Sequence, residues 1–298
     1  MNSIYALNRS ELNQFFQSHG HSALFTDFVF DEIYKNFENK NNDLNLLSQK
    51  AKQQIVENFD FNLPKIKQAH ESSDGTVKFL IEFEDGASVE TVLIPFFKKY
   101  TVCLSTQVGC AMNCQFCYTA TQGLQRNLKA NEIIGQYLIA WLYLKEKRSN
   151  HSIKPNVVFM GQGEPLHNFE ELKKALQIMT DTKALELGPR QITLSTVGFL
   201  PGLERWKELP SINLALSLHS PFEEERKSLI PLNAKYPLKE VLAKLDTLPL
   251  KKRQYITLEY LLLKDFNDSE AHAEELSKVL PKEKVIFNII PFNPWPVT

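Results

Sequence analysis

Cys110-Ala-Met-Asn-Cys114-Gln-Phe-Cys117 is the stretch from which the rest of this chain is interpreted. All four cysteines of the 298-residue chain lie between residues 103 and 117. A disulfide framework would spread its cysteines to join distant segments of a small secreted domain. The clustering seen here indicates metal or redox chemistry, because three thiols at this spacing can surround one compact ligand.

Two kinds of metal site compete for these three cysteines. A structural zinc site closes with four ligands, usually as two separated pairs, and the local sequence offers no fourth Cys or His. A [4Fe–4S] cluster on three protein thiolates leaves one iron open for a further ligand. The sequence therefore favours a cluster on Cys110, Cys114 and Cys117, with zinc or inert buried thiols as the alternatives.

After Tyr100 the chain alternates short apolar strands with amphipathic helices. The predicted strands are 101–105, 156–160, 191–196, 213–218, 256–263 and 285–290, and the predicted helices are 130–147, 169–180, 237–248 and 268–279. Such alternation predicts parallel strands with right-handed crossovers. Six units predict an α/β fold, an incomplete (β/α)6 barrel whose active site lies at the carboxyl ends of the strands. An open doubly wound sheet is the alternative.

Three segments are expected along the chain. Residues 1–70 predict a small helical accessory domain, and residues 71–99 a β-hairpin linker, because Asp85-Gly86 lies between two strand-like runs. Residues 100–298 form the predicted barrel. Asn131 and Asn168 are expected to cap two of its helices.

Net charge and hydropathy limit the partners and the cellular location that can be expected of the protein. The formal net charge is −1, so overall charge gives no support for nucleic-acid binding. The start of the chain lacks the pattern of a signal peptide, and no apolar run approaches the roughly 18 residues of a membrane span. We expect a cytoplasmic protein that does not associate with membranes.

A second group of candidate residues follows the later strands. Gly161-Gln-Gly163-Glu164-Pro165 ends one strand, Ser195 lies at the end of the next, and Ser217-Leu218-His219 ends the one after that. Taken alone, the glycine turn is read more simply as a loop, and His219 as a satisfied core histidine. Polar residues at successive strand ends are nevertheless what one pocket at the top of a barrel requires.

With Phe116 before the last Cys, the cysteine loop resembles the signature of the radical SAM superfamily. The likeness extends over roughly residues 88–296 and becomes closer to the RlmN/Cfr family of radical SAM RNA methyltransferases, above all to its RlmN branch. The residues that carry it are VETVLIP (89–95), CLSTQVGCAMNCQFCYTATQGLQRNLKANEIIGQ (103–136), VVFMGQGEPLHNF (157–169), ITLSTVG (192–198), ALSLHS (215–220), LIPLNAKYPL (229–238), LEYLLLKDFNDS (258–269) and NIIPFNPWP (288–296).

The resemblance implies a substrate, cofactors and partners. RlmN-type enzymes methylate C2 of an adenosine in 23S rRNA and also modify tRNA, using a [4Fe–4S] cluster, two molecules of S-adenosylmethionine (SAM) and an electron donor such as flavodoxin. The open iron of the cluster holds the amine and carboxylate of SAM. The positions that match the SAM contacts of the family are Gly163, Glu164, Ser195, Ser217, Leu218, His219 and Asn293.

Two further residues take catalytic roles by the same resemblance. Glu90 matches the general base that removes the adduct proton, and Cys103 matches the cysteine that releases the product by forming a disulfide with a methyl-carrying cysteine. In the family the methyl carrier lies beyond the PFNP motif, whereas no cysteine follows Cys117 in these 298 residues. We therefore expect cluster and SAM binding without completed methyl transfer. A radical SAM enzyme with another substrate, or a non-catalytic cluster or zinc protein that binds RNA, are the competing hypotheses.

Overall fold

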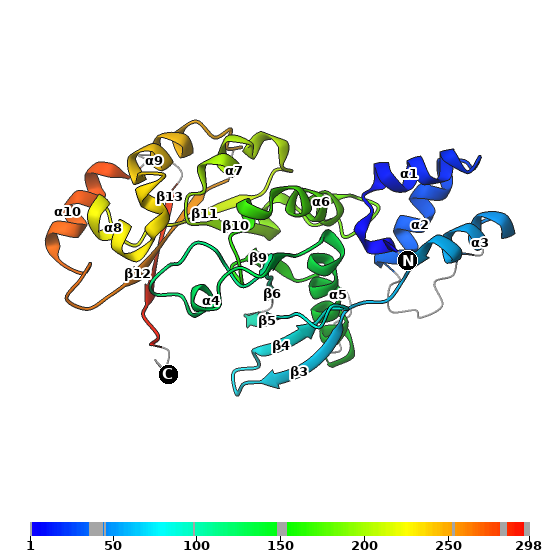
Figure 1. The fold of residues 1–298 in the computed structure, drawn as a ribbon, viewed down its shortest axis with the longest axis horizontal. Coiled ribbons are helices and arrows are strands. Elements are labelled where there is room, and N and C mark those ends of the chain that lie inside the picture. The colour runs from blue at the N-terminus through cyan, green and yellow to red at the C-terminus, as the bar shows by residue number, and fades with distance from the viewer. Residues whose placement is uncertain are drawn as a thin grey trace.

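A computed structural model describes residues 2–35, 44, 46–97, 99–147, 154–251, 254–280 and 285–294. Its centre is a nine-stranded sheet in the order β13-β12-β11-β10-β9-β6-β5-β4-β3 (Figure 1). Six of these strands run parallel, namely β6 (Lys99–Cys103), β9 (Asn156–Phe159), β10 (Ile192–Thr196), β11 (Asn213–Ser217), β12 (Ile256–Leu262) and β13 (Val285–Pro291). They confirm the predicted six-strand incomplete barrel, since β13 and β3 remain at opposite edges of the sheet.

The predicted hairpin continues this sheet. Strands β4 (Val77–Glu82) and β5 (Ser88–Phe96) pair antiparallel around the Asp85-Gly86 turn, and β5 pairs in turn with β6. A further strand, β3 (Lys65–Glu71), pairs with β4 where the sequence had predicted no strand. All seven of its residues are exposed, so it lacks the apolar alternation that marks a half-buried strand.

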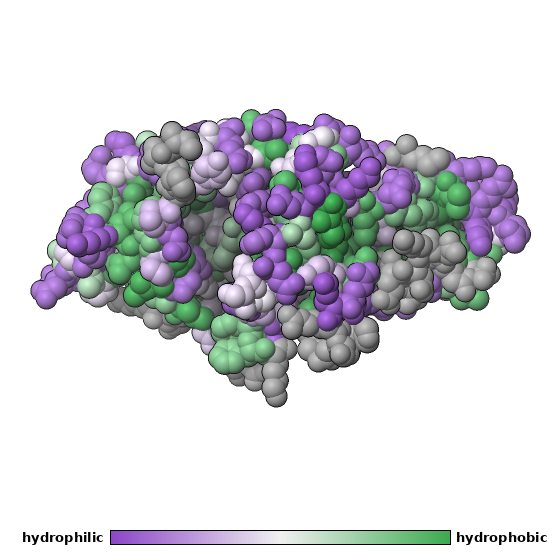
Figure 2. All heavy atoms as spheres, turned by 90° about the horizontal axis from the view of Figure 1, so that it is seen from below, coloured by the Kyte–Doolittle hydropathy of each residue, from purple (hydrophilic) through white to green (hydrophobic). Residues whose placement is uncertain are grey.

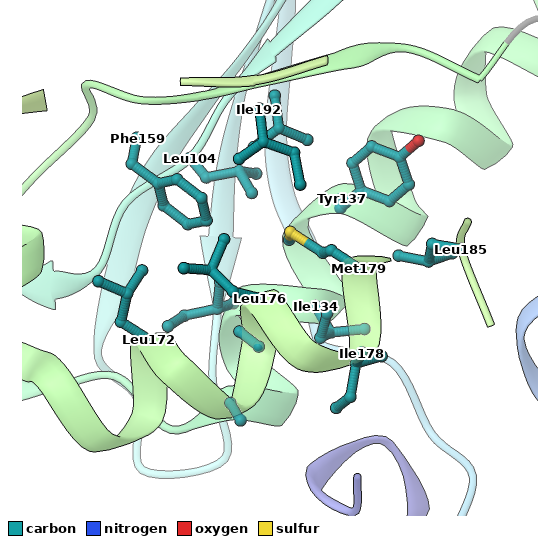
Figure 3. Packing of buried hydrophobic residues seen from close by; sticks show 14 of the residues in the cluster. Leu104, Ile134, Tyr137, Phe159, Leu172, Leu176, Ile178, Met179, Leu185 and Ile192 are labelled. Atoms are coloured by element: carbon teal, nitrogen blue, oxygen red, sulfur yellow. The ribbon is translucent and has the colours of Figure 1, made fainter. Parts of the chain in front are cut away.

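Helices pack on one face of the sheet. The predicted ones are α5 (Ala130–Lys147), α6 (Phe169–Thr180), α9 (Leu238–Asp246) and α10 (Glu270–Val279), joined by the shorter α4 (Tyr118–Thr121), α7 (Leu200–Glu204) and α8 (Glu223–Leu229). Figure 3 shows Leu172, Leu176 and Met179 of α6 facing Phe159, Leu104 and Ile192. Along β9 and β10 the intervening residues are only half-buried, so the opposite face of the sheet lacks this helical cover.

The two expected asparagine caps are wrong. Asn131 lies inside α5, which begins one residue earlier. Asn168 does precede α6, but its side chain donates from Nδ2 to the carbonyls of Thr106 (2.9 Å) and Leu128 (2.7 Å). Its amide therefore fastens the chain around the cysteine loop instead of capping a helix.

Among the described residues, three α-helices precede the sheet: α1 (Arg9–Ser18), α2 (Leu24–Lys35) and α3 (Gln49–Asn58). They form one end of the molecule, close to α5 and α6 (Figure 1). Their buried residues belong to the same hydrophobic cluster as the core of the barrel. On the face seen from below, hydrophobic residues reach the surface between hydrophilic ones (Figure 2).

Candidate active site

The cysteine loop begins just after β7 (Gln107–Val108), a short strand that follows the carboxyl end of β6. Gly109, at φ +76°, starts the loop, and a Cβ atom there would lie 1.7 Å from the Gly123 carbonyl oxygen. The close approach is needed because the Cys110 amide donates to that oxygen at 3.1 Å. Glycine is therefore the residue that allows the loop to close on itself.

The loop is held from the other side by α8. The Gln115 amide donates to the Leu229 carbonyl at 2.9 Å, at the end of that helix. Met112 and Cys114 pack with Leu229 and Ile230 in a small hydrophobic cluster separate from the main core. Two elements far apart in the sequence thus fix the same loop.

Cys110, Cys114 and Cys117 line one cavity of about 270 Å³. The cavity also receives residues from the carboxyl ends of the parallel strands, including Gly163, Glu164, Ser195, Ser217 and His219. Eight of the ten predicted cluster and SAM residues are therefore brought together around one space. Of the other two, Leu218 is completely buried, and Asn293 is exposed beyond β13 and outside the cavity lining.

The thiols fit an iron–sulfur cluster better than a zinc ion. All four cysteines are free. Burial raises the pKa of Cys110 to about 11 and raises that of Cys114 further, so both are neutral thiols without a metal. No three Cys, His, Asp or Glu side chains among the described residues converge as ligands of one ion. A cubane does not need such convergence, since each thiolate binds its own iron.

Glu164 is a buried carboxyl fixed by backbone amides. It accepts from Leu166 N (3.1 Å) and Val197 N (2.9 Å), which ties the end of β9 to the end of β10. Burial raises its pKa to about 7, against the lowering effect of these donors. Each carboxylate oxygen has two acceptor positions, so capacity remains for an amine in the cavity. Gly163 next to it is required by packing, because a Cβ there would lie 2.6 Å from the Gln107 Cβ.

The sequence left two interpretations of His219 open, a core histidine and a residue of the pocket, and the structure agrees with both. Its Nδ1 accepts from Leu261 N at 3.0 Å, and its ring meets Phe116 of the cysteine loop edge-on with centroids 4.6 Å apart. Burial, reinforced by the nearby Arg226 charge, lowers its pKa to about 3. It is therefore a neutral histidine that is held through Nδ1 and also lines the cavity.

Glu90 and Cys103 lie on the face of the sheet that lacks helical cover, which we call the open face. Cys103 is paired with Val92 on β5 and with Val158 on β9. Because Glu90 is two residues from Val92, both candidates point to the same side. Glu90 is half-exposed and bonded to Lys78 at 2.8 Å, whereas burial raises the pKa of Cys103 to about 11.

The disulfide expected from the resemblance is not supported by the structure, since Cys103 is a free thiol. Glu90 and Cys103 are also absent from the lining of the cavity. The two predicted catalytic residues therefore lie on the sheet beside the cavity, and they are available from the open face.

Sequence reasoning missed two buried polar residues. Gln136 of α5 accepts from the Thr91 hydroxyl (2.8 Å) and Ser105 N (2.9 Å), joining β5 to the chain after β6. Arg226 of α8 is completely buried behind the ends of β10 and β11. Both lie in helical runs that resemble ordinary solvated or packed faces, so residue type alone gave no signal.

Comparisons with known proteins agree with this geometry. The radical SAM superfamily model matches residues 104–276. RlmN of Lawsonia intracellularis, a dual-specificity RNA methyltransferase, is 47% identical over 83% of this chain and 71% of its own. The probable RlmN of Dictyoglomus thermophilum is 38% identical over 99% of this chain and 84% of its own.

A solved structure is similar over the whole chain. The radical SAM methyltransferase from Sphaerobacter thermophilus has a TM-score of 0.88 and 32% identity, covering 100% of this chain and 87% of that one. Within the described residues, no helix is both long and apolar enough to cross a membrane. From its sequence and its fold, the chain belongs to the radical SAM superfamily and, within it, to the RlmN family of dual-specificity RNA methyltransferases.

Proposed function

We propose that this chain provides the cluster and SAM site of an enzyme that methylates C2 of adenosine in 23S rRNA and in tRNA. The supporting observation is the single cavity on which Cys110, Cys114 and Cys117 converge with the strand ends. In this proposal the three thiolates bind a [4Fe–4S] cluster. Gly163, Glu164, Ser195, Ser217, Leu218, His219 and Asn293 form the SAM site.

When bound, the cluster supplies one electron that opens SAM to a radical able to remove hydrogen from an unreactive carbon. The protein residues position this chemistry. Glu164 offers buried acceptor positions to the SAM amine, while neutral His219 holds the Phe116 side of the cysteine loop against β12. Half-buried strand residues leave the open face for the adenosine.

Glu90 and Cys103 would act at that face. The Glu90 carboxylate takes the proton of the methylated base, and the Cys103 sulfur releases the product from the methyl-carrying cysteine by forming a disulfide with it. None of the four cysteines here occupies that methyl-carrying position.

The remaining assignments rest on the same function. We assign an external low-potential electron donor such as flavodoxin, and a cytoplasmic location, where its RNA substrates are found. We also assign residues 1–70 to an accessory domain, 71–99 to a hairpin linker and 100–298 to the catalytic barrel.

The test uses the whole chain, reconstituted anaerobically with iron and sulfide. We expect bound iron and sulfide, and cleavage of SAM to 5′-deoxyadenosine when dithionite is added. Zinc without iron would contradict the cluster, and SAM cleavage that requires a small molecule instead of RNA would contradict the RNA substrate.

A further inference from the structure

Arg226 is completely buried, and its guanidinium donates four hydrogen bonds to protein acceptors. Its Nη2 donates to the carbonyls of Val197 (2.7 Å) and Ser217 (2.9 Å). Its Nε donates to the Leu218 carbonyl at 3.1 Å, and its Nη1 donates to the Asn233 side chain at 2.5 Å. The side chain thus joins α8 to the carboxyl ends of β10 and β11.

All four acceptors are neutral groups. The carboxylate that acts on Arg226 is Glu223, whose charge influences it without a hydrogen bond between the two side chains. Burial lowers the pKa of Arg226 to about 10, which still leaves it charged at neutral pH. Burying a cation without a contacting anion is energetically unfavourable, because the charge loses its hydration. Its position therefore calls for a negative partner.

The candidate negative partner is the group of three cysteine thiolates, which lies across the strand ends that Arg226 binds. Val197 and Ser217, whose carbonyls bind Arg226, both line the cavity with the three cysteines. The last residue of α8, Leu229, is bonded to the cysteine loop as well. Arg226 is thus placed to act on whatever charge the thiols carry.

We propose that Arg226 is the charge-compensating and positioning residue of the cluster site. It fixes the strand ends that line the cavity, and it offsets the negative charge of three thiolates and a reduced cluster. One electron from an external donor reduces the cluster and adds one unit of negative charge. A fixed buried cation favours that reduced state. This role rests on the proposed function, because it requires a cluster on these cysteines.

The test is a redox titration of the reconstituted chain, followed by electron paramagnetic resonance. Arg226→Gln removes the charge, Arg226→Lys keeps it without the same bonds, and Glu223→Gln removes a nearby negative charge. Arg205→Gln is the matched control, because Arg205 is a partly exposed arginine paired with Glu170 and Glu208. Iron content and thermal unfolding of the iron-free form are measured for every variant.

The midpoint potential is expected to fall by at least about 59 mV in R226Q, which is a tenfold change in a one-electron equilibrium. It should fall less in R226K, rise in E223Q and stay unchanged in R205Q. If R226Q holds no iron, the directions in which the midpoint potential shifts in R226K and E223Q still test the proposal.

A wild-type potential in iron-loaded R226Q would overturn the inference. So would an equal fall in R226K and R226Q, or an unchanged potential in E223Q. A wild-type chain that binds no iron would instead contradict the proposed function itself, and the two failures are therefore distinguishable.

Discussion

The two regions that carry the candidate residues are built in opposite ways. Around the cavity, Glu164 and His219 are buried, and backbone amides donate hydrogen bonds to both side chains. On the antiparallel side of the sheet, Glu90 is half-exposed and its bonded partner is an equally exposed lysine. The protein itself shapes the region assigned to the cofactors, whereas the region assigned to RNA is left to solvent. The cofactor region is thus preorganised, whereas the RNA region can adapt to its substrate.

The largest expected effect separates the cysteines of the two regions. Cys114→Ala should lower bound iron from about four atoms per chain toward none after reconstitution, because a cluster ligand is lost. Cys103→Ala is the matched control and should keep its iron, since Cys103 lies outside the cavity. Iron and sulfide analysis measures both, and equal iron loss in the two variants would break the distinction.

A pair of glycines tests how firmly the cysteine loop is preorganised. Both Gly109 and Gly123 have positive φ, so alanine costs each about 1–2 kcal/mol. A Cβ at Gly109 also meets the Gly123 carbonyl at 1.7 Å, whereas a Cβ at Gly123 meets nothing within 4 Å. Urea unfolding should find Gly109→Ala less stable than Gly123→Ala by about 2 kcal/mol. Equal stability of the two variants would mean that the loop yields easily.

His219 offers a test of burial through pH. Its pKa is lowered from 6.5 to about 3, so the unfolded chain binds the proton more readily. The stability present above pH 6.5 is therefore lost as the pH falls toward 3. His219→Asn keeps an acceptor and suits φ +60°. Unfolding of the iron-free protein at several pH values should show a slope shallower by up to about 1.4 kcal/mol per pH unit. An unchanged slope would contradict the burial of this ring.

The smallest expected effect is on the exposed side. Glu90→Gln should change the free energy of unfolding by no more than about 0.5 kcal/mol, because the ion pair with Lys78 is solvated. Cleavage of SAM should continue at the wild-type rate. Thermal unfolding and 5′-deoxyadenosine release measure the two expectations. A loss of more than about 1 kcal/mol would show that this region is as tightly built as the cavity.

Much of the fold was predictable because its signals are local. Each of the six parallel strands is a short apolar run between turn residues, and each occurs within a few residues of its predicted range. Strand β3 was missed because its residues alternate neither in polarity nor in burial. Its place depends on pairing with β4, which is not encoded within the segment itself.

The residues that line the site could be predicted from the sequence, but the buried residues that hold them in place could not. Cys110, Glu164 and His219 belong to recognisable motifs, and they do meet at one cavity. Arg226 lies in the run Glu-Glu-Glu-Arg-Lys, which is typical of a solvated helix start. Its burial follows from the contacts of α8 with two distant strands, and composition alone cannot reveal such contacts.

The mixed sheet also has a consequence for the order of folding. Strands β3 to β6 pair with neighbours in sequence, whereas each parallel pair must wait for a crossover. During synthesis the antiparallel ladder that carries Glu90 and Cys103 can form while β10, β11 and α8 are still being made. The cysteine loop emerges early, but its anchor at Leu229 comes much later. Its thiols therefore pass through a period of exposure, in which metal delivery competes with oxidation.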